Sequence, residues 1–228
     1  MIECILYDNE CMTVGKKSMN PVGIVVHSTG ANNKYIKRYV QPSKSDSNYD
    51  KLMQIIGVNK YGNHWNRSRV YKSTHYFIGE LNDGTIEVCK TLPHNVSAWG
   101  VGKGSNGSYN YDPTGHIQIE VCEDNLSDVN YFNECYNKII MLCAEICINE
   151  HLNPMEIVSH KEAHIKGYGS NHRDIDHWLN KFGVTMDDLR KDVSDYIDEI
   201  NTAKALHFSG ELTFNGEKYE ITGEARKR

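Results

Sequence analysis

The sequence predicts an α/β fold in which helices flank a central mixed β-sheet. Short runs rich in β-branched residues predict strands, and two longer segments carry apolar residues at helical spacing. The chain has 228 residues, 39% of them hydrophobic and 24% charged, which is enough for one sizeable domain with its own core. We therefore expect a main domain over residues 1–200. Residues 201–228 would form a short C-terminal hairpin or tail, or the start of a further domain.

Four segments are predicted to form strands. They are residues 23–29 (GIVVHST), 74–90 (THYFIGELNDGTIEVCK), 116–123 (HIQIEVCE) and 156–160 (EIVSH). In the second segment, Asn82-Asp83-Gly84 supplies a hairpin turn. Before Glu120, the third alternates polar residues, expected to face outward, with apolar residues that face inward. The first and fourth segments both end on a histidine, so an ionisable ring is expected at each of two strand ends.

Two long helices are predicted in the second half of the chain. Residues 127–152 place apolar side chains on one face, with Ser127 as the N-cap and Asn153-Pro154 as the stop. The other helix is expected over about 185–200, where "TMDD" resembles a capping box. A shorter helix is expected over 35–39.

Long polar loops are predicted between these elements. Residues 41–73 are expected to be partly loop, and residues 94–115 form a long excursion rich in Asn, Gly and Tyr. Loops of this length in a compact domain tend to carry function. After residue 200, "LTFNGEKYEITGEARKR" predicts a small hairpin that turns at Asn215-Gly216.

Charge and cysteine content exclude several classes of protein. The net charge of −5 provides no basic field for nucleic acid or an anionic membrane. No apolar run approaches the ~18–20 residues that cross a bilayer, and the N-terminus does not resemble a signal peptide, so a cytoplasmic location is expected. The seven cysteines include no CxxC pair, which favours a reducing compartment. None stands in a setting that would lower its pKa, so thiol catalysis is not expected.

Metal-competent side chains cluster near the two strand-end histidines. His27 and His160 end strands, and "SNHRDIDHW" adds His172, Asp174 and other candidates one loop later. A catalytic zinc site needs three protein ligands and leaves a fourth position open to solvent, and strand ends can provide both. A single histidine at such a position is more often a hydrogen-bonded structural residue. Two of them beside a loop dense in His and Asp favour a metal site.

Four motifs in this order resemble a known family. They are "GIVVHST", "THYFI…NDGTI", "HIQIEVCEDN" and "IVSHKEAH…GYGSNHRDIDHWLNKFG". They look like zinc-dependent N-acetylmuramoyl-L-alanine amidases, the type shared by phage lysozyme-like amidases, AmpD-like recycling amidases and peptidoglycan recognition proteins. The closest style is that of clostridial or bacillar phage endolysins. The resemblance covers about residues 20–195, and it implies an amidase-like fold with Zn²⁺ as cofactor and peptidoglycan as substrate.

The resemblance implies particular metal ligands. His27 and His160 match the two histidine ligands of the family, and "SNHRDIDHW" places Asp174 as the third ligand. Relatives of this style often carry proline after that aspartate, whereas this chain has Ile175. The departure leaves Asp176 as a rival ligand.

The resemblance also implies catalytic residues. Glu120 matches the glutamate that activates the attacking water, and an inward-pointing carboxylate on a strand agrees with this role. An exposed edge-strand glutamate is the alternative. His172 falls where many relatives carry a lysine that stabilises the transition state. Some relatives use a tyrosine where this chain has Thr74, so Glu120 must do more of the work.

Substrate contacts are expected from the strand ends and the long loops. The residues implied are His75, Trp99, Tyr109, Asn171 and His177, with Trp178 shaping the rim beside His177 and with Asn66 and Tyr111 as further candidates. Relatives commonly read "AWHAG" where this chain reads "AWGVG", so one substrate-side histidine is missing. His94 or His116 could stand near the same place.

The expected activity is hydrolysis of the amide between N-acetylmuramic acid and L-alanine, as a phage or prophage endolysin. Such a protein would wait in the cytoplasm and reach the wall on host lysis, and this chain would be its catalytic part. A non-catalytic peptidoglycan-binding module and a cytoplasmic muropeptide-recycling amidase are the alternatives. Activity on intact walls against activity on soluble fragments would separate the two enzymes.

Overall fold

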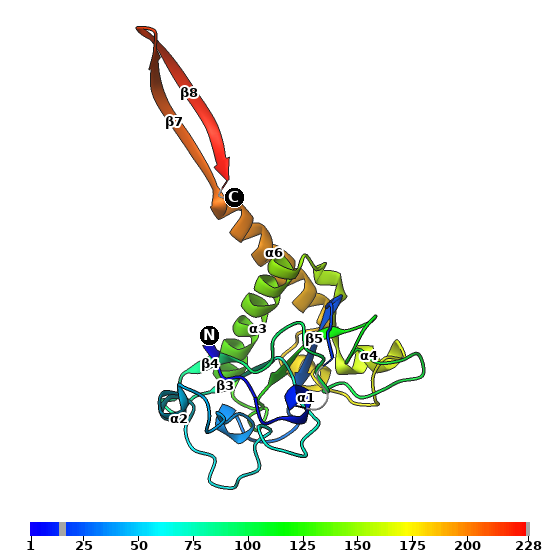
Figure 1. Ribbon diagram of the computed structural model, residues 1–228. Coiled ribbons are helices and arrows are strands. Elements are labelled where there is room, and N and C mark those ends of the chain that lie inside the picture. Colours follow the sequence, from blue (N-terminus) through cyan, green and yellow to red (C-terminus); the bar gives the residue numbers. More distant parts are fainter. Residues whose placement is uncertain (14–16, 227–228) are drawn as a thin grey trace.

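A computed structural model describes residues 1–13 and 17–226, and its body is built on a six-stranded sheet (Figure 1). The strand order is β1-β4-β3-β5-β2-β6. The strands are β1 (Ile2–Glu3), β2 (Gly23–Ser28), β3 (Tyr76–Glu80), β4 (Ile86–Lys90), β5 (His116–Val121) and β6 (Ile157–Ser159). All neighbouring pairs are parallel except β3 and β4, which form the predicted antiparallel hairpin. The expected mixed sheet is therefore confirmed.

Helices cover the sheet on both faces. They are α1 (Glu10–Thr13), α2 (Tyr49–Ile56), α3 (Val129–Glu150), α4 (His160–Ile165), α5 (Asp176–Lys181) and α6 (Met186–Lys204), with 3₁₀ turns η1 (Ile36–Arg38) and η2 (Pro154–Glu156). The predicted cap of α3 is wrong by one residue, because Asp128 accepts from the backbone N–H groups of Asn130 and Tyr131. The predicted capping box of α6 is present, since Thr185 and Asp188 each accept the other's backbone N–H.

Three predicted boundaries differ from the structure for local reasons. The helix expected over 35–39 is a single 3₁₀ turn, and α2 lies inside the segment expected to be partly loop. His160 does not end β6 but begins α4, because Ser159 caps that helix with Glu162 in a capping box. The short helix α5 was not predicted.

The two faces of the sheet have different chemistry. Alternate residues of β2 and β5, such as Ile24, Val26, Ile117 and Ile119, join a core with α3, α5 and α6. The opposite set on these strands includes His27, Gln118 and Glu120. Gln118 does not face outward as predicted, because loops and helices cover that face of β5 and bury it, and Glu120 is buried on the same face.

Apolar clusters flank the polar face. Phe77 and Cys122 pack with Ile36 and residues of α2 on one side, and Val25 and Val158 pack with Val101 on the other. The polar face is therefore a buried strip between two apolar walls. All seven cysteines are free, and all are buried.

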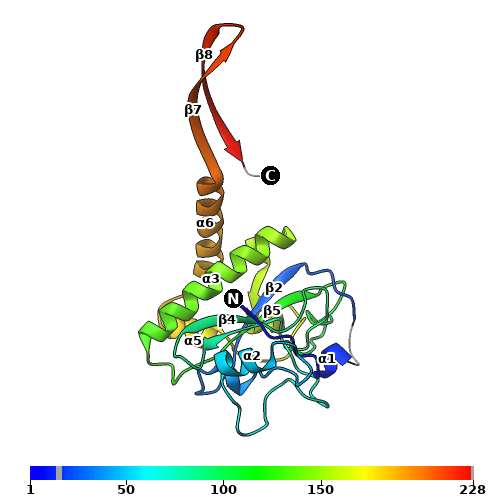
Figure 2. The same cartoon turned by 60° about the vertical axis from the view of Figure 1, so that its left-hand side comes forward.

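Helix α6 carries the C-terminal segment away from the body. It continues into a hairpin of β7 (Ala205–Phe214) and β8 (Glu217–Arg226), which turns at Asn215 and Gly216 (Figures 1 and 2). In both views this hairpin projects from the body on the helix. Within residues 1–13 and 17–226, no helix is both long enough and apolar enough to cross a membrane.

Candidate metal centre

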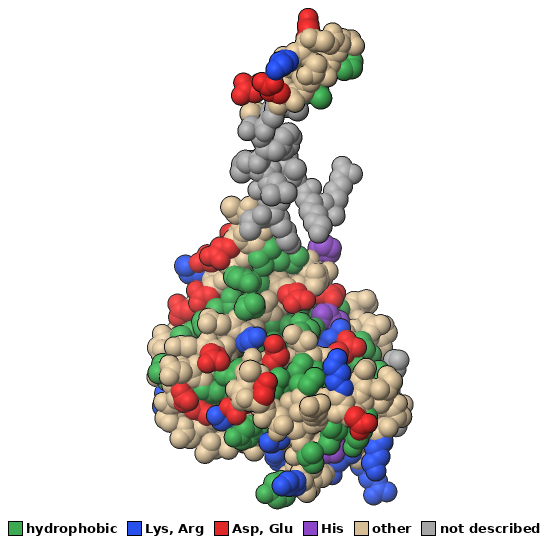
Figure 3. Space-filling view, turned by 90° about the vertical axis from the view of Figure 1, so that its left-hand side faces the viewer, with side chains coloured by type: hydrophobic (Ala, Val, Ile, Leu, Met, Phe, Trp, Pro, Cys, Tyr) green, Lys and Arg blue, Asp and Glu red, His purple; other side chains and the backbone are tan. Residues whose placement is uncertain are grey.

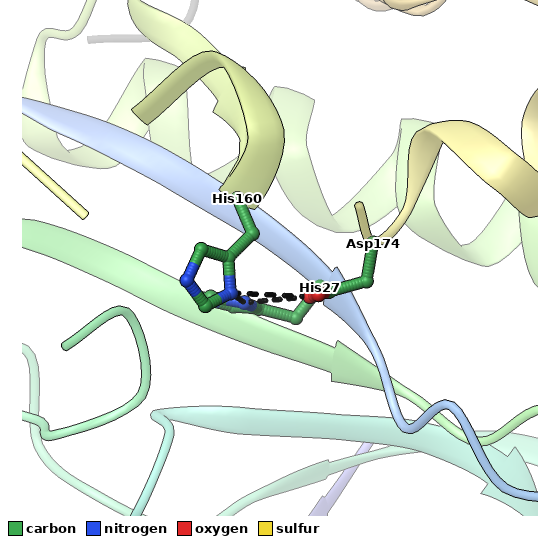
Figure 4. A group of neighbouring side chains, drawn as sticks. All are labelled: His27, His160 and Asp174. Carbon is green, nitrogen blue, oxygen red and sulfur yellow. Dashed lines mark hydrogen bonds and ion pairs between the residues drawn. The ribbon is translucent and has the colours of Figure 1, made fainter. Parts of the chain in front are cut away.

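His27, His160 and Asp174 meet at the carboxyl edge of the parallel strands (Figure 4). The Nδ1 atoms of the two histidines lie 3.1 Å apart. Asp174 Oδ2 lies 3.1 Å from Nδ1 of His27 and 3.3 Å from Nδ1 of His160. Both rings are buried, and Asp174 is partly buried. These three ligand types, held this close, form a candidate metal centre.

Separate elements position the three side chains. His27 lies near the end of β2, and the neighbouring strand β6 pairs Ser159 with Val26 of β2. His160 follows Ser159 directly, so the capped start of α4 places its ring beside His27. Asp174 lies just before α5, where its carbonyl accepts from the backbone N–H of Lys161. The carboxyl ends of parallel strands are where α/β proteins commonly place their sites.

A chain of hydrogen bonds fixes the tautomer of His27. Asn110 Oδ1 accepts from the backbone N–H groups of Gly100 and Val101 at 3.1 Å each, so it is the oxygen of that amide. Gln118 Nε2 donates to the same oxygen at 2.9 Å. Gln118 Oε1 therefore faces His27 Nε2 at 3.2 Å and accepts its hydrogen. The Nδ1 atom of His27 is left with a free lone pair.

The hydroxyl of Ser170 fixes the tautomer of His160. Its hydroxyl donates to the carbonyl of Val101 at 3.2 Å and lies 3.1 Å from His160 Nε2. His160 Nε2 therefore donates, and its Nδ1 carries a lone pair. Two nitrogen lone pairs and a carboxylate oxygen then face one another. Such an acceptor set is unfavourable when empty and suits a cation.

Asp176, the rival ligand, lies apart from this cluster. It is the first residue of α5, and its Oδ1 lies 3.7 Å from Nζ of Lys161. The cluster contains Asp174 instead. Ile175, which stands where relatives carry proline, is fully buried in the core beside α5.

Glu120 lies beside His27 across the β2–β5 pair, in register with it. Residues paired in parallel register point to the same face, so its carboxylate shares the strip with the candidate centre. Burial raises the pKa of the Glu120 carboxyl well above its usual range, and Asp174 and Glu123 raise it further, against a smaller effect of Lys72. Glu120 is 8% exposed, so the exposed edge-strand alternative does not hold.

His172 stacks on a ring of the cluster. Its ring is nearly parallel to that of His160, with 4.6 Å between centroids, and its Nδ1 lies 3.6 Å from Asp174 Oδ1. The side chain is 59% exposed. His172 therefore stands at the solvent side of the centre.

Four residues predicted near the substrate are placed elsewhere by the structure. His75 is fully buried, with Nδ1 accepting from the N–H of Gln118 and Nε2 donating to the carbonyl of Val96. The ring of Tyr109 is enclosed by two others, Asn66 is buried in backbone bonds, and Trp178 is in the helix-side core. All four side chains are buried, and hydrogen bonds occupy the polar side-chain atoms of His75 and Asn66.

The other predicted contacts remain at the surface. Trp99 is 47% exposed and stacks on the partly buried Tyr111, with 6.1 Å between the ring centroids. Asn171 is exposed in the loop before Asp174. His177 is half-buried, and its Nε2 lies 2.9 Å from Oε1 of Glu123.

Neither His94 nor His116 replaces the histidine missing from "AWGVG". His94 bonds to Glu150 and to the hydroxyl of Tyr76 at 2.6 Å each, on the helix-covered face. His116 begins β5 and pairs with Gly23 at the start of β2, at the end of the strands opposite Glu120.

Sequence reasoning missed the outer partners of the centre. Gln118, Asn110 and Ser170 were not predicted as site residues, yet they hold the two histidine rings. A signal for Gln118 existed, since it lies two residues before Glu120 on the same strand and must share its face. Ser170 and Asn110 come from loops, where no periodicity indicates direction.

The sequence matches a known protein family over most of its length. Residues 17–176 match the N-acetylmuramoyl-L-alanine amidase family. The chain belongs to this family, and its reaction is hydrolysis of the amide between N-acetylmuramic acid and L-alanine in peptidoglycan. A search of curated proteins finds no match.

Solved structures share the fold. The catalytic domain of XlyA is 19% identical, with a TM-score of 0.53 over 84% of this chain and 97% of that one. The PlyG catalytic domain is 15% identical, with a TM-score of 0.52 over 86% and 96%. A mutant endolysin from Bacillus subtilis is 19% identical, with a TM-score of 0.50 over 85% and 99%. The predicted resemblance to amidases of the endolysin type is confirmed.

Proposed function

We propose that this amidase is a zinc enzyme whose ion is held by His27, His160 and Asp174. The observation that supports this is the set of three acceptor atoms that face one another. A tetrahedral zinc with bonds of about 2.0–2.2 Å holds its ligand atoms roughly 3.3–3.5 Å apart. The three observed separations, 3.1, 3.1 and 3.3 Å, are close to this geometry. When bound, zinc acts as a Lewis acid toward the scissile carbonyl and toward water.

Glu120 is proposed as the general base. Burial raises the pKa of Glu120, and a carboxylate with a raised pKa accepts a proton more readily than an exposed glutamate does. Glu120 would take a proton from the attacking water and deliver it to the nitrogen of L-alanine as the amide bond breaks. The products are the carboxylic acid of the lactyl group and a free alanine amine.

His172 is proposed to stabilise the transition state. It stands at the solvent side of the cluster, held by its stack on His160 and by Asp174. A protonated imidazole there would donate to the oxygen that becomes negative when water adds. Loss of one such donor typically lowers the rate by about 100-fold or more.

Trp99, Asn171 and His177 are proposed to contact the substrate at the rim. His177 is tied to the end of β2, because Glu123 accepts from both His177 Nε2 and the Ser28 hydroxyl. Through these two contacts, Glu123 holds His177 close to the strand that carries His27. The exposed ring of Trp99, stacked on the partly buried Tyr111, offers a flat apolar surface, which is suited to a sugar face.

The biological role that fits best is that of a phage or prophage endolysin, with residues 1–200 as its catalytic domain. The fold shared with endolysin catalytic domains supports this role. A recycling amidase would share the same catalytic residues. A binding-only module is disfavoured, because His27, His160, Asp174 and Glu120 are all competent for catalysis.

The His27→Ala variant tests the metal proposal. It removes one of the three acceptor atoms and leaves the other two in place. We expect both the bound zinc, measured by elemental analysis after dialysis, and the hydrolysis of a soluble muropeptide to be lost. A variant that retained stoichiometric zinc at normal affinity would exclude His27 as a ligand.

A further inference from the structure

A groove of about 450 Å³ opens next to the active edge of the sheet. It lies between the chain that follows β2 and the loop that follows α2. Its lining residues are Asn33, Tyr35, Lys37, Arg38, Val58, Asn59, Lys60, Tyr61 and Asn63. None of these residues belongs to the candidate metal centre, and none was expected to contact the substrate.

The charge of the groove differs from that of the whole chain. Three of its lining residues, Lys37, Arg38 and Lys60, are cationic, and of the described residues that line it none is acidic. The chain as a whole carries a net charge of −5. In the space-filling view, several Lys and Arg side chains gather at the end of the body away from the hairpin (Figure 3). The nearby Lys34 is different, because Glu80 pairs with it at 2.5 Å.

Hydrogen bonds hold the walls of the groove in place. Arg38 donates to the carbonyl of Asn63 at 2.9 Å, and Asn59 donates to the carbonyl of Arg38 at 3.1 Å. The side chains of Asn59 and Asn63 also bond to each other at 3.0 Å. Lys37 lies over the ring of Tyr35 at 4.7 Å. These contacts hold Lys37 and Arg38 in place, and both are partly buried, which strengthens their field, whereas Lys60 is exposed.

The groove is connected to the catalytic edge through short contacts. The backbone N–H of Asn33 donates to the carbonyl of Glu123 at 2.8 Å. Glu123 accepts from Ser28, the residue after His27, and from His177 at the rim. Glu123 thus links Asn33 in the groove wall to the end of the strand that carries His27.

We propose that this groove binds oxyanions of the bacterial cell wall, carboxylate or phosphate, while the neighbouring centre cleaves the amide. The inference builds on the proposed function, since the wall is the substrate of that same site. Clustered cations attract an anionic polymer and raise its local concentration near the catalytic edge. The carboxylates would come from stem peptides and the phosphates from wall-linked anionic polymers.

The test uses the whole chain with two paired substitutions. Lys37→Glu with Lys60→Glu reverses two charges, and Lys37→Arg with Lys60→Arg keeps them as the matched control. Arg38 is left unchanged because it also supports the loop. Binding to purified Gram-positive walls is measured by sedimentation at 4 °C over minutes, at low and high NaCl. The probes are intact walls, walls freed of phosphate polymers with hydrofluoric acid, and walls whose carboxylates are amidated.

Charge reversal should weaken binding to intact walls at low salt by at least about threefold, and high salt should remove the difference. The arginine control should bind like the original chain. If the charge-reversed and original chains bind equally only to phosphate-free walls, the groove binds phosphate. If they bind equally only to amidated walls, it binds carboxylate. Equal binding of the reversed and original chains to all three walls would overturn the proposal. Release of alanine amines from a soluble muropeptide, measured in parallel, reports on the proposed catalytic function independently.

Discussion

The Nδ1 atoms of His27 and His160 lie 3.1 Å apart, while each ring turns its Nε2 atom outward to a different side chain. The outward bonds to Gln118 and Ser170 hold the proton of each ring on Nε2. The inner nitrogens are thereby held as lone pairs beside the carboxylate of Asp174. These buried hydrogen bonds orient the two rings so that three acceptor atoms face one another. A metal site requires this arrangement.

The two aspartates of "SNHRDIDHW" form a matched pair of variants. Asp174→Asn should weaken zinc binding by more than the roughly 10–100-fold that loss of an outer partner costs. Asp176→Asn should bind zinc nearly as the original chain does, since Asp176 lies by Lys161. Competition with a fluorescent zinc chelator measures both affinities. If the two variants exchanged these behaviours, Asp176 would be the ligand.

Glu120→Gln should separate metal binding from catalysis. The substitution keeps the shape of the side chain but removes the base, so the turnover of a soluble muropeptide should fall by about 100-fold or more. Zinc content should not change, because Glu120 is outside the ligand cluster. The thermal melting temperature should rise or stay constant, since a buried ionisable carboxyl is replaced by a neutral amide. Near-normal turnover would remove Glu120 from the mechanism.

Gln118→Leu tests how much the hydrogen bond from His27 Nε2 to Gln118 contributes to zinc affinity. The change leaves His27 Nε2 without its acceptor and removes one of the three donors to Asn110 Oδ1. We expect zinc affinity to fall about 10–100-fold. Gln118→Glu serves as the control, because a carboxylate can still accept from Nε2. Equal zinc affinities for the leucine variant and the original chain would show that the ring needs no such support.

Two buried histidines should make the fold sensitive to acid. Burial lowers the pKa of His75 to about 3 and that of His116 to about 4. In the unfolded chain these rings take up protons below about pH 6.5, whereas in the folded protein the same rings stay neutral until the pH is much lower. The free energy of unfolding should therefore fall as the pH decreases from about 6.5 toward 4, by roughly 1–2 kcal/mol per ring at pH 5.

The variant His116→Asn checks this effect. An amide can also donate to the carbonyl of Thr114, as the ring of His116 does, so we expect the variant to fold. Urea unfolding at pH 7 and pH 5 should show a smaller loss of stability for the variant than for the original chain. The same loss in both proteins would mean that His116 takes up its proton without unfolding.

The parts of the site carried by regular elements were predictable from sequence. His27 and Glu120 lie on strands whose alternation determines which face each side chain occupies, and the motif order then identified the family. His160 was placed correctly in space although it begins a helix, since the end of β6 and the start of α4 coincide. The cap of α3 is Asp128 and not Ser127. Both residue types can cap a helix, so sequence alone does not decide between two neighbouring candidates.

The parts carried by loops were not predictable. Sequence cannot show that Ser170 reaches His160, that Asn110 orients Gln118, or that His75 is enclosed by backbone partners. These contacts depend on how residues 94–115 and 166–175 fold over the sheet, and polar loops have no periodicity that indicates direction. The error in the outward direction of polar residues on β5 has the same cause, because it was the loops that buried them.

The most direct test is the release of new N-terminal alanine from purified Gram-positive cell wall, measured before and after removal of metal with a chelator and again after zinc is added back. We expect new alanine amines to appear with the untreated protein, to disappear after the chelator and to return when zinc is added back. Amine release that continued unchanged in the metal-free protein, or that zinc could not restore to a folded apoprotein, would contradict the proposal that His27, His160 and Asp174 hold a catalytic zinc.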